Sequence, residues 1–234
     1  MKSDTALYRT CVYPLAIFMG FSILLGVGGS LVEWDHPDAP WWRRAPEMLV
    51  YPVQTLVVGW WLWHVRREAE WDWNLRASLL GAVFGVVGIG IWLVPYFAGW
   101  IPDTGNGFCP ERIFGEGTAA TYAEYVLRFL RAAVIVALAE ELFWRGFLMR
   151  WCVNRDFPQQ VAIGTHSWLG YVVTTAAFVF IHSPADYAGA FCYGTLTYIL
   201  VVLTKRITPA ITMHAVANAI MGACAVGFNM PQLW

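Results

Sequence analysis

The sequence predicts an all-α protein that crosses a membrane about seven times. Hydrophobic residues make up 58% of the 234-residue chain and charged residues only 13%, whereas a soluble domain carries about 25% charge. The apolar residues also gather in runs of about twenty, which is the length of a membrane-spanning helix. Because the net charge is −1 and no basic run occurs, nucleic acid is not expected as a partner.

The expected spans follow the apolar runs in order. They cover residues 10–32, 46–64, 77–100, 125–149, 168–182, 187–204 and 209–228. No small-residue cleavage site follows the first run, so it is read as an anchor and not as a cleaved signal peptide. The third run spaces Gly81, Gly85 and Gly88 as close helix contact requires. Residues 101–121 are rich in Gly and Pro and are expected outside the bilayer.

Lys and Arg in the short loops predict the orientation. One side of the expected bundle collects nine of them: Lys2, Arg9, Arg66, Arg67, Arg76, Arg150, Arg155, Lys205 and Arg206. The other side has only Arg43, Arg44 and Arg112. The N-terminus is therefore expected in the cytoplasm. With no internal repeat and no second domain, residues 1–234 are interpreted as a single integral membrane domain.

The fourth run carries charges that a membrane span does not need. Arg128 and Arg131 fall inside it, followed by the pair Glu140-Glu141 and by Arg145. Ionisable groups within a span are costly and are functional candidates by default. Glu141 and Arg145 have the i, i+4 spacing of a helical ion pair. Glu140 projects about 100° away and is expected to lack a local partner, which leaves it free to act as a base.

Two later runs add polar groups of the same kind. The fifth run ends at His182, and the seventh places His214 and Asn218 at i, i+4 on one helix face. A single helix separates the two histidines, so they can meet only if residues 183–187 lie inside the protein at membrane depth. Irregular backbone at that depth must be buried in protein or line a cavity.

Other intramembrane hydrolase chemistries lack their residues. The chain has no H-E-x-x-H zinc motif, no serine in a G-x-S-x-G context and no pair of aspartates within the expected spans. The hydrolase chemistry that remains is attack by a water molecule that glutamate and histidine activate.

The order E-E-x-x-x-R, F-x-x-x-H, H-x-x-x-N resembles the CAAX-protease and bacteriocin-processing family of intramembrane endopeptidases. Here the motifs read Glu140-Glu141-Leu-Phe-Trp-Arg145, Phe178-Val-Phe-Ile-His182 and His214-Ala-Val-Ala-Asn218. The resemblance implies a helical core like that of the Ras-converting endopeptidase, at about 122–230. It implies cleavage near the C-terminal end of a membrane-anchored protein or peptide substrate.

The resemblance also implies roles for the site residues. Glu140 would activate water with help from His182, His214 and Asn218 would donate to the oxyanion, and Glu141 and Arg145 would hold the structure. No cofactor is expected, although Glu140, His182 and His214 could bind zinc as the alternative.

Further stretches are similar to a bacterial subgroup of this family that is associated with exosortase-type C-terminal sorting systems. They are Tyr51-Pro52-Val-Gln-Thr-Leu, residues 140–151 and Trp234. This similarity implies a multi-pass protein of a bacterial inner membrane.

Two other function classes stay open at this point. A non-proteolytic scaffold for sorting or immunity could keep the same fold, and a small transporter could use the polar residues as a proton relay. Intact catalytic positions argue against the first, and the missing inverted repeat argues against the second.

Overall fold

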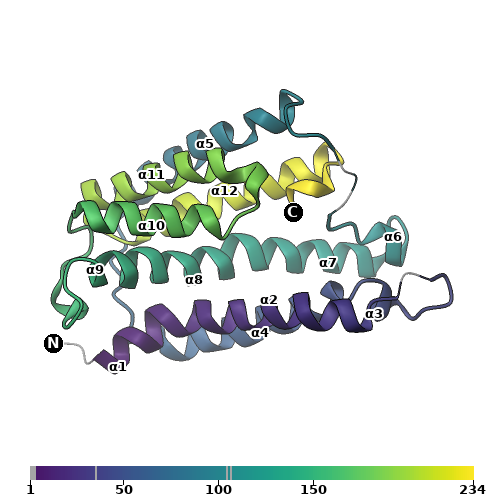
Figure 1. Ribbon diagram of the computed structural model, residues 1–234, viewed down its shortest axis with the longest axis horizontal. Helices are drawn as coiled ribbons and strands as arrows, with labels where there is room; N and C mark the ends of the chain where they lie inside the picture. Colours follow the sequence, from purple (N-terminus) through teal and green to yellow (C-terminus); the bar gives the residue numbers. More distant parts are fainter. Residues whose placement is uncertain (1–3, 35, 104, 106) are drawn as a thin grey trace.

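The computed structural model describes residues 4–34, 36–103, 105 and 107–234, and all regular structure within them is helical (Figure 1). The expectation of an all-α protein is confirmed. The longer helices are α2 (Tyr13–Val32), α4 (Glu47–Val65), α5 (Leu75–Phe97), α7 (Ala119–Leu130), α10 (Trp168–Phe180), α11 (Tyr187–Thr204) and α12 (Thr208–Gly227). The short ones are α1 (Asp4–Leu7), α3 (Trp41–Arg44), α6 (Glu111–Phe114), α8 (Ala137–Glu141) and α9 (Met149–Trp151).

Wide and tight helical turns complete the structure. The π-helical turns are η1 (Tyr8–Val12), η2 (Arg131–Val136) and η3 (Leu142–Leu148), and the 3-10 turns are η4 (Pro158–Gln160), η5 (Pro184–Asp186) and η6 (Pro231–Leu233). Because η2 and η3 join α7, α8 and α9 end to end, residues 119–151 form one long helix.

Four helical segments are long and apolar enough to cross a membrane: Thr5–Val32, Leu75–Phe97, Pro184–Thr204 and Thr208–Gly227. They indicate an integral membrane protein. The other expected runs are also helical, but α10 has only 13 residues and the helix 119–151 carries charges along its length. The number of seven spans is therefore not confirmed. Orientation stays a prediction, and Lys2, one of the cations on which it rests, lies outside the described residues.

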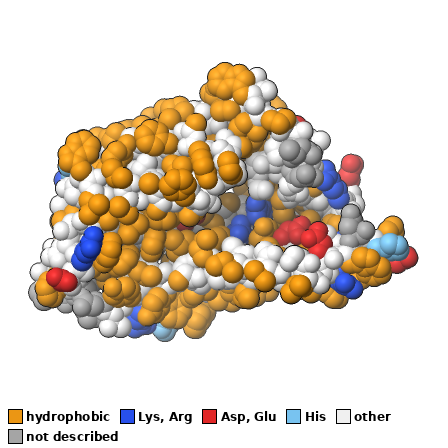
Figure 2. Space-filling model, in the orientation of Figure 1, with side chains coloured by type: hydrophobic (Ala, Val, Ile, Leu, Met, Phe, Trp, Pro, Cys, Tyr) orange, Lys and Arg blue, Asp and Glu red, His pale blue; other side chains and the backbone are white. Residues whose placement is uncertain are grey.

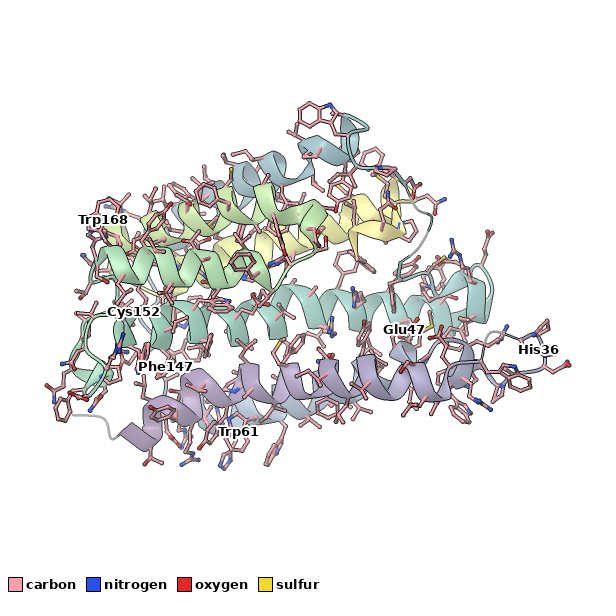
Figure 3. The ribbon with its side chains drawn as sticks, in the orientation of Figure 1. His36, Glu47, Trp61, Phe147, Cys152 and Trp168 are labelled. Atoms are coloured by element: carbon pink, nitrogen blue, oxygen red, sulfur yellow. The ribbon has the colours of Figure 1, made fainter. Side chains whose placement is uncertain are left out.

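The long helix 119–151 lies between two layers (Figure 1). α2 and α4 pack together on one side of it, and α5, α10, α11 and α12 lie on the other. The helices run roughly along one axis, so that Trp168 and His36 mark opposite ends of the molecule (Figure 3). Much of the outer surface is apolar, and a hollow on one face holds basic and acidic side chains (Figure 2). An apolar outer surface suits contact with lipid.

The glycines of α5 let it approach α12 closely, as the sequence predicts. A Cβ on Gly85 would lie 2.6 Å from the carbonyl oxygen of Met213, and one on Gly88 would lie 2.9 Å from the ring of Tyr193. Side chains cannot occupy such gaps, so glycine at these positions sets the distance between α5 and its neighbours. That close contact fixes α12, which carries half of the candidate site.

The turn between α10 and α11 lies over the middle of the long helix and not at the end of the bundle (Figure 1). α10 is short, with 13 residues and a length of about 20 Å, so the chain turns back halfway along its neighbours. His182 directly follows α10 and thereby comes to the same level as α8 and the middle of α12. This placement explains how His182 and His214 can meet although one helix separates them in the sequence.

Candidate active site

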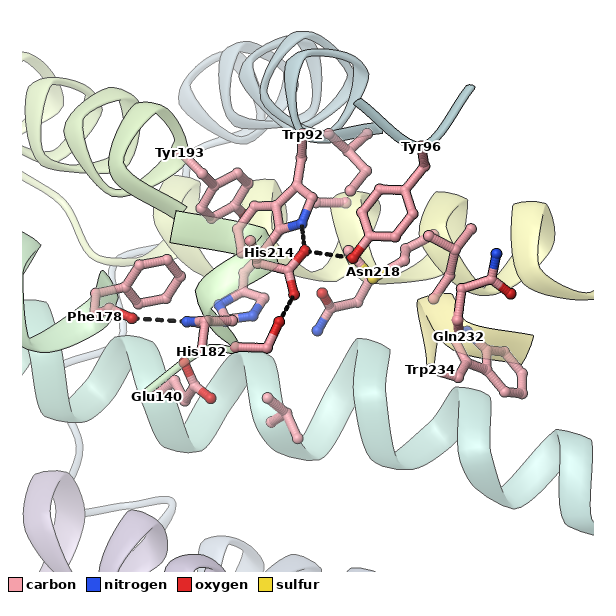
Figure 4. Close-up of a pocket in the computed structure, with 17 residues that line it drawn as sticks. Trp92, Tyr96, Glu140, Phe178, His182, Tyr193, His214, Asn218, Gln232 and Trp234 are labelled. Carbon is pink, nitrogen blue, oxygen red and sulfur yellow. Dashed lines mark hydrogen bonds between the residues drawn. The ribbon is translucent and has the colours of Figure 1, made fainter. Parts of the chain in front are cut away.

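A cavity of about 360 Å³ opens between the long helix and the layer above it. Four of the six predicted site residues line it: Glu140 from α8, His182 after α10, and His214 and Asn218 from α12 (Figure 4). The remaining wall residues are Ile89, Trp92, Tyr96, Val136, Phe178, Ser183, Asp186, Tyr193, Ala217, Met221, Gln232, Leu233 and Trp234. Side chains from three separate runs of the sequence therefore meet in one cavity, which has the size of a ligand pocket.

The two neighbouring glutamates have different surroundings. Glu140 lines the cavity, whereas Glu141 is fully buried. Consecutive residues of a helix project about 100° apart, which allows one carboxylate to face the cavity and the other the protein interior. π-helical turns on both sides of α8 widen the helix here, and such turns are frequent at functional sites.

Glu140 has a local partner, contrary to the expectation from sequence. The indole Nε1–H of Trp144 donates to Glu140 Oε2 at 3.2 Å. Trp144 lies one helical turn further along, at i+4, so the indole reaches back over the carboxylate. No hydrogen bond to Oε1 of Glu140 occurs among the described residues, and this oxygen is available to a water molecule or a substrate.

The expected ion pair between Glu141 and Arg145 is present and has a third member. Arg145 Nη1 lies 3.2 Å from Glu141 Oε2 and 3.3 Å from Oε1. His214 Nδ1 lies 2.9 Å from the same Oε1. Arg145 is 1% exposed and Glu141 is not exposed at all. Glu141 thus connects a structural cation to a histidine of the cavity, a link that the sequence does not reveal.

Both histidines are oriented by the same ring nitrogen. Nδ1 of His182 lies 2.7 Å from the carbonyl oxygen of Phe178, and Nδ1 of His214 lies next to Glu141. A hydrogen-bond acceptor next to Nδ1 keeps the ring proton on Nδ1. Nε2 is then the nitrogen left to interact with water or a substrate. Ring contacts hold His182 further, with Trp92 at 5.1 Å and Phe178 at 4.6 Å between centroids.

One hydrogen-bond donor of the Asn218 side chain is used by a backbone carbonyl group. Its side-chain Nδ2 donates to the carbonyl oxygen of Ala132 at 2.8 Å. Ala132 belongs to the π-helical turn η2, where widening of the helix frees carbonyl groups from their usual partners. An amide nitrogen carries two hydrogens, so one donor of Asn218 remains for a substrate. The bond to Ala132 also fixes the direction in which that donor points.

Comparison with known proteins gives one match. Residues 122–220 match the family model described as type II CAAX prenyl endopeptidase Rce1-like. The matched region is therefore similar to a type II CAAX prenyl endopeptidase. No curated protein and no solved structure matches the chain. The family is one of proteases, and a CAAX protease acts on a membrane-associated substrate. All six predicted site residues lie within the matched region.

The cavity wall also contains an acidic residue outside the predicted site, Asp186, which lies in the turn η5. Its Oδ1 accepts hydrogen bonds from Trp92 Nε1 and from the Tyr96 hydroxyl, both at 2.8 Å, and Ser183 Oγ donates to Oδ2 at 2.6 Å (Figure 4). Trp92 and Tyr96 belong to α5, so Asp186 ties the turn after His182 to another helix. No local sequence signal marks this role, because these two donors lie about ninety residues away.

The zinc alternative would need Glu140, His182 and His214 to converge on one point. Within the described residues, no three His, Cys, Asp or Glu side chains are grouped so as to hold a metal ion. Glu140, His182 and His214 share the cavity without forming such a group. As placed, these three side chains do not fit a zinc site.

Proposed function

We propose that this protein is an intramembrane endopeptidase that hydrolyses a peptide bond near the C-terminal end of a membrane-associated protein. The observation that carries the proposal is that Glu140, His182, His214 and Asn218 line one cavity, although they come from three separate helical segments. The first two suit activation of water, and the last two suit stabilisation of negative charge. The proposal also agrees with the protease family of residues 122–220.

Water activation is assigned to Glu140 and His182. A water molecule between them donates one hydrogen to the carboxylate of Glu140 and the other to Nε2 of His182. Its oxygen attacks the carbonyl carbon of the substrate while Glu140 takes the proton, and the same proton then passes to the nitrogen of the leaving peptide. General acid–base assistance of this kind contributes about 10²–10⁴-fold to a rate.

Stabilisation of the oxyanion is assigned to His214 and Asn218. Asn218 offers its second amide hydrogen. His214 donates through Nε2–H when its ring is protonated, and Glu141 stabilises that charged form through Nδ1 at 2.9 Å. Losing one oxyanion donor costs about 10²–10³ in rate in other hydrolases. Glu141 and Arg145 therefore hold His214 ready and do not themselves meet the substrate.

The wider setting is proposed from the motif resemblance. We place the protein in a bacterial inner membrane with a cytoplasmic N-terminus and link it to a C-terminal protein-sorting system. Its substrates are then exported or membrane proteins that carry a C-terminal membrane-anchored tail.

The test is C-terminal mass spectrometry of membrane and exported proteins from cells with and without this gene. Cells are complemented with the wild type, with Glu140→Gln, or with Glu116→Gln, which changes an exposed acid outside the cavity. New C-termini that require the gene, return with the wild type and the Glu116 variant, and are missing with Glu140→Gln support the proposal. Identical termini in all strains would favour the scaffold, and normal cleavage by Glu140→Gln would refute the water-activation mechanism.

A further inference from the structure

Two arginines of the long helix have no role in the proposed chemistry. Arg128 and Arg131 lie on the N-terminal side of Glu140, next to the turn η2. Arg131 is only 9% exposed, and Nη1 of Arg128 is fully buried without a hydrogen-bond partner. A buried cation that lacks a partner is costly, and such a cost is usually retained for a ligand or a function.

Aromatic rings surround the two guanidinium groups. The Cζ atom of Arg131 lies 4.1 Å from the ring centroid of Tyr51 and 4.7 Å from that of Phe18. Arg128 lies 5.7 Å from the ring of Trp234, and it also stacks over two further rings, those of Tyr51 and Phe108. The flat faces of these rings hold the guanidiniums in place and exclude water, and Nη1 of Arg128 is left without a hydrogen-bond partner.

No anion satisfies these groups directly. The hydrogen bond that holds Arg131 is neutral, from Nε to Gln54 Oε1 at 2.7 Å. Among the described residues, no carboxylate oxygen lies within 4.0 Å of either guanidinium. Glu47, at the start of α4 beside α7 (Figure 3), interacts with Arg128 only at longer range. Arg128 and Arg131 therefore retain N–H groups that could donate hydrogen bonds to a carboxylate.

The arginine pair adjoins the cavity of the catalytic residues. Trp234 lines that cavity and also stacks with Arg128. Ala132, the neighbour of Arg131, accepts the hydrogen bond of Asn218. Figure 2 shows basic side chains, with acidic side chains beside them, within the hollow of this face. Neither arginine lines the cavity itself, so a peptide that extends from Glu140 along the long helix towards its N-terminal end would have to pass Trp234 to reach them.

The spacing along the helix sets the length of that peptide. Arg131 and Arg128 precede Glu140 by nine and twelve residues, which correspond to about 14 and 18 Å at 1.5 Å per residue. An extended chain advances about 3.3 Å per residue. The distance therefore matches about four to five residues between the attacked bond and a group held by the arginines.

We propose that Arg128 and Arg131 bind the free α-carboxylate at the C-terminus of the substrate. Guanidinium groups bind carboxylates through paired, charge-assisted hydrogen bonds. The arginines then act as a specificity site, which selects substrates that end about four to five residues beyond the cleaved bond. This inference rests on the proposed protease function and adds the feature of the substrate that is recognised.

The experiment uses one lipid-anchored peptide library with ten randomised C-terminal residues, prepared once as free acids and once as C-terminal amides. Purified full-length protein in vesicles is incubated with each library, and the products are counted by mass spectrometry. The wild type should cleave the acids at least about tenfold better than the amides, as expected when a charge-assisted hydrogen bond is lost. Cleavage should fall about four to five residues from the end.

Variants of the two arginines test whether they cause the preference for free acids. Arg128→Met and Arg131→Met should each bring the acid-to-amide ratio closer to one, with the change mainly in KM. Arg155→Met is the matched control, because Arg155 also lies over an aromatic ring, that of Trp151 at 5.0 Å, but it follows α9, beyond the other end of the long helix. It should keep the wild-type ratio. Because the ratio is measured within each protein, a variant with less folded protein still reports on recognition.

Three results would overturn the proposal. Equal cleavage of acids and amides by the wild type, with none by Glu140→Gln, removes the carboxylate site and leaves the protease intact. If the arginine variants keep the wild-type ratio but change the response to phosphatidylglycerol in the vesicles, the arginines bind lipid headgroups instead. If the wild type cleaves neither library, the proposed function itself fails and the specificity site fails with it.

Discussion

Glu140 and Glu141 are adjacent, yet removing the charge of each should have different consequences. Glu141→Gln strands the guanidinium of Arg145, which is 1% exposed. Breaking a buried ion pair from one side costs about 3–5 kcal/mol. For a chain of this length each kcal/mol lowers the melting temperature by about 2–4 °C, so the expected loss is about 6–20 °C. His214 also loses the charge of its partner at 2.9 Å, and cleavage should fall with stability.

Glu140→Gln is the matched comparison. The only hydrogen bond of Glu140 among the described residues comes from the indole of Trp144, and the amide oxygen of Gln can still accept it. This variant should melt within about 2 °C of the wild type, a change of under about 1 kcal/mol, while losing cleavage. The double variant Glu141→Gln with Arg145→Met should recover part of the lost stability, because no charge is then left alone.

The assay is thermal unfolding in detergent followed by tryptophan fluorescence, together with membrane abundance and cleavage for each variant. The reasoning is refuted if both single variants are equally stable and equally inactive. It is also refuted if the double variant is less stable than Glu141→Gln, since the stranded cation would then not be the cause.

Three further predictions follow from the packing and the sequence. Gly85→Ala should lower the melting temperature and membrane abundance, because its methyl group would meet a backbone carbonyl of α12 at 2.6 Å, whereas Gly90→Ala should not, since nothing lies within 4 Å. Asp186→Asn keeps the size of the side chain but weakens its hydrogen bonds, and it should lower kcat about tenfold by loosening the turn after His182, measured as cleavage at unchanged abundance. Reporter fusions after Trp234 and after Arg155 should give opposite signals, and equal signals would contradict the predicted orientation.

The site residues were predictable to the extent that charge stands out in apolar sequence. Glu140, His182, His214 and Asn218 interrupt apolar runs, and the high cost of polar groups in lipid makes each interruption informative. The i, i+4 spacing also predicted the pair of Glu141 with Arg145. Local spacing and hydropathy thus sufficed for the helical class and for the four polar residues that meet in the cavity.

Contacts between distant segments could not be predicted in this way. The bond from Glu141 to His214 joins residues 73 positions apart, and Asp186 finds its donors on α5. The partner of Glu140 is close in sequence, because Trp144 lies four residues further along the same helix. It was still missed, because an indole in an apolar run resembles a packing residue. The π-helical turns leave no periodic signal at all, since one extra residue in a turn does not alter composition.

The short helix α10 has a consequence for how water, the second reactant of hydrolysis, reaches the cavity. Hydrolysis consumes water, which the hydrocarbon interior excludes, and that interior is about 30 Å thick. A helix of 13 residues covers only about 20 Å of it. Beyond its end, the hydroxyl and carboxylate groups of Ser183 and Asp186 line the cavity in place of a further helical turn. If the protein is the proposed protease, we expect water to reach the scissile bond through the space that the missing turns leave, from one side of the bilayer and without a channel across it.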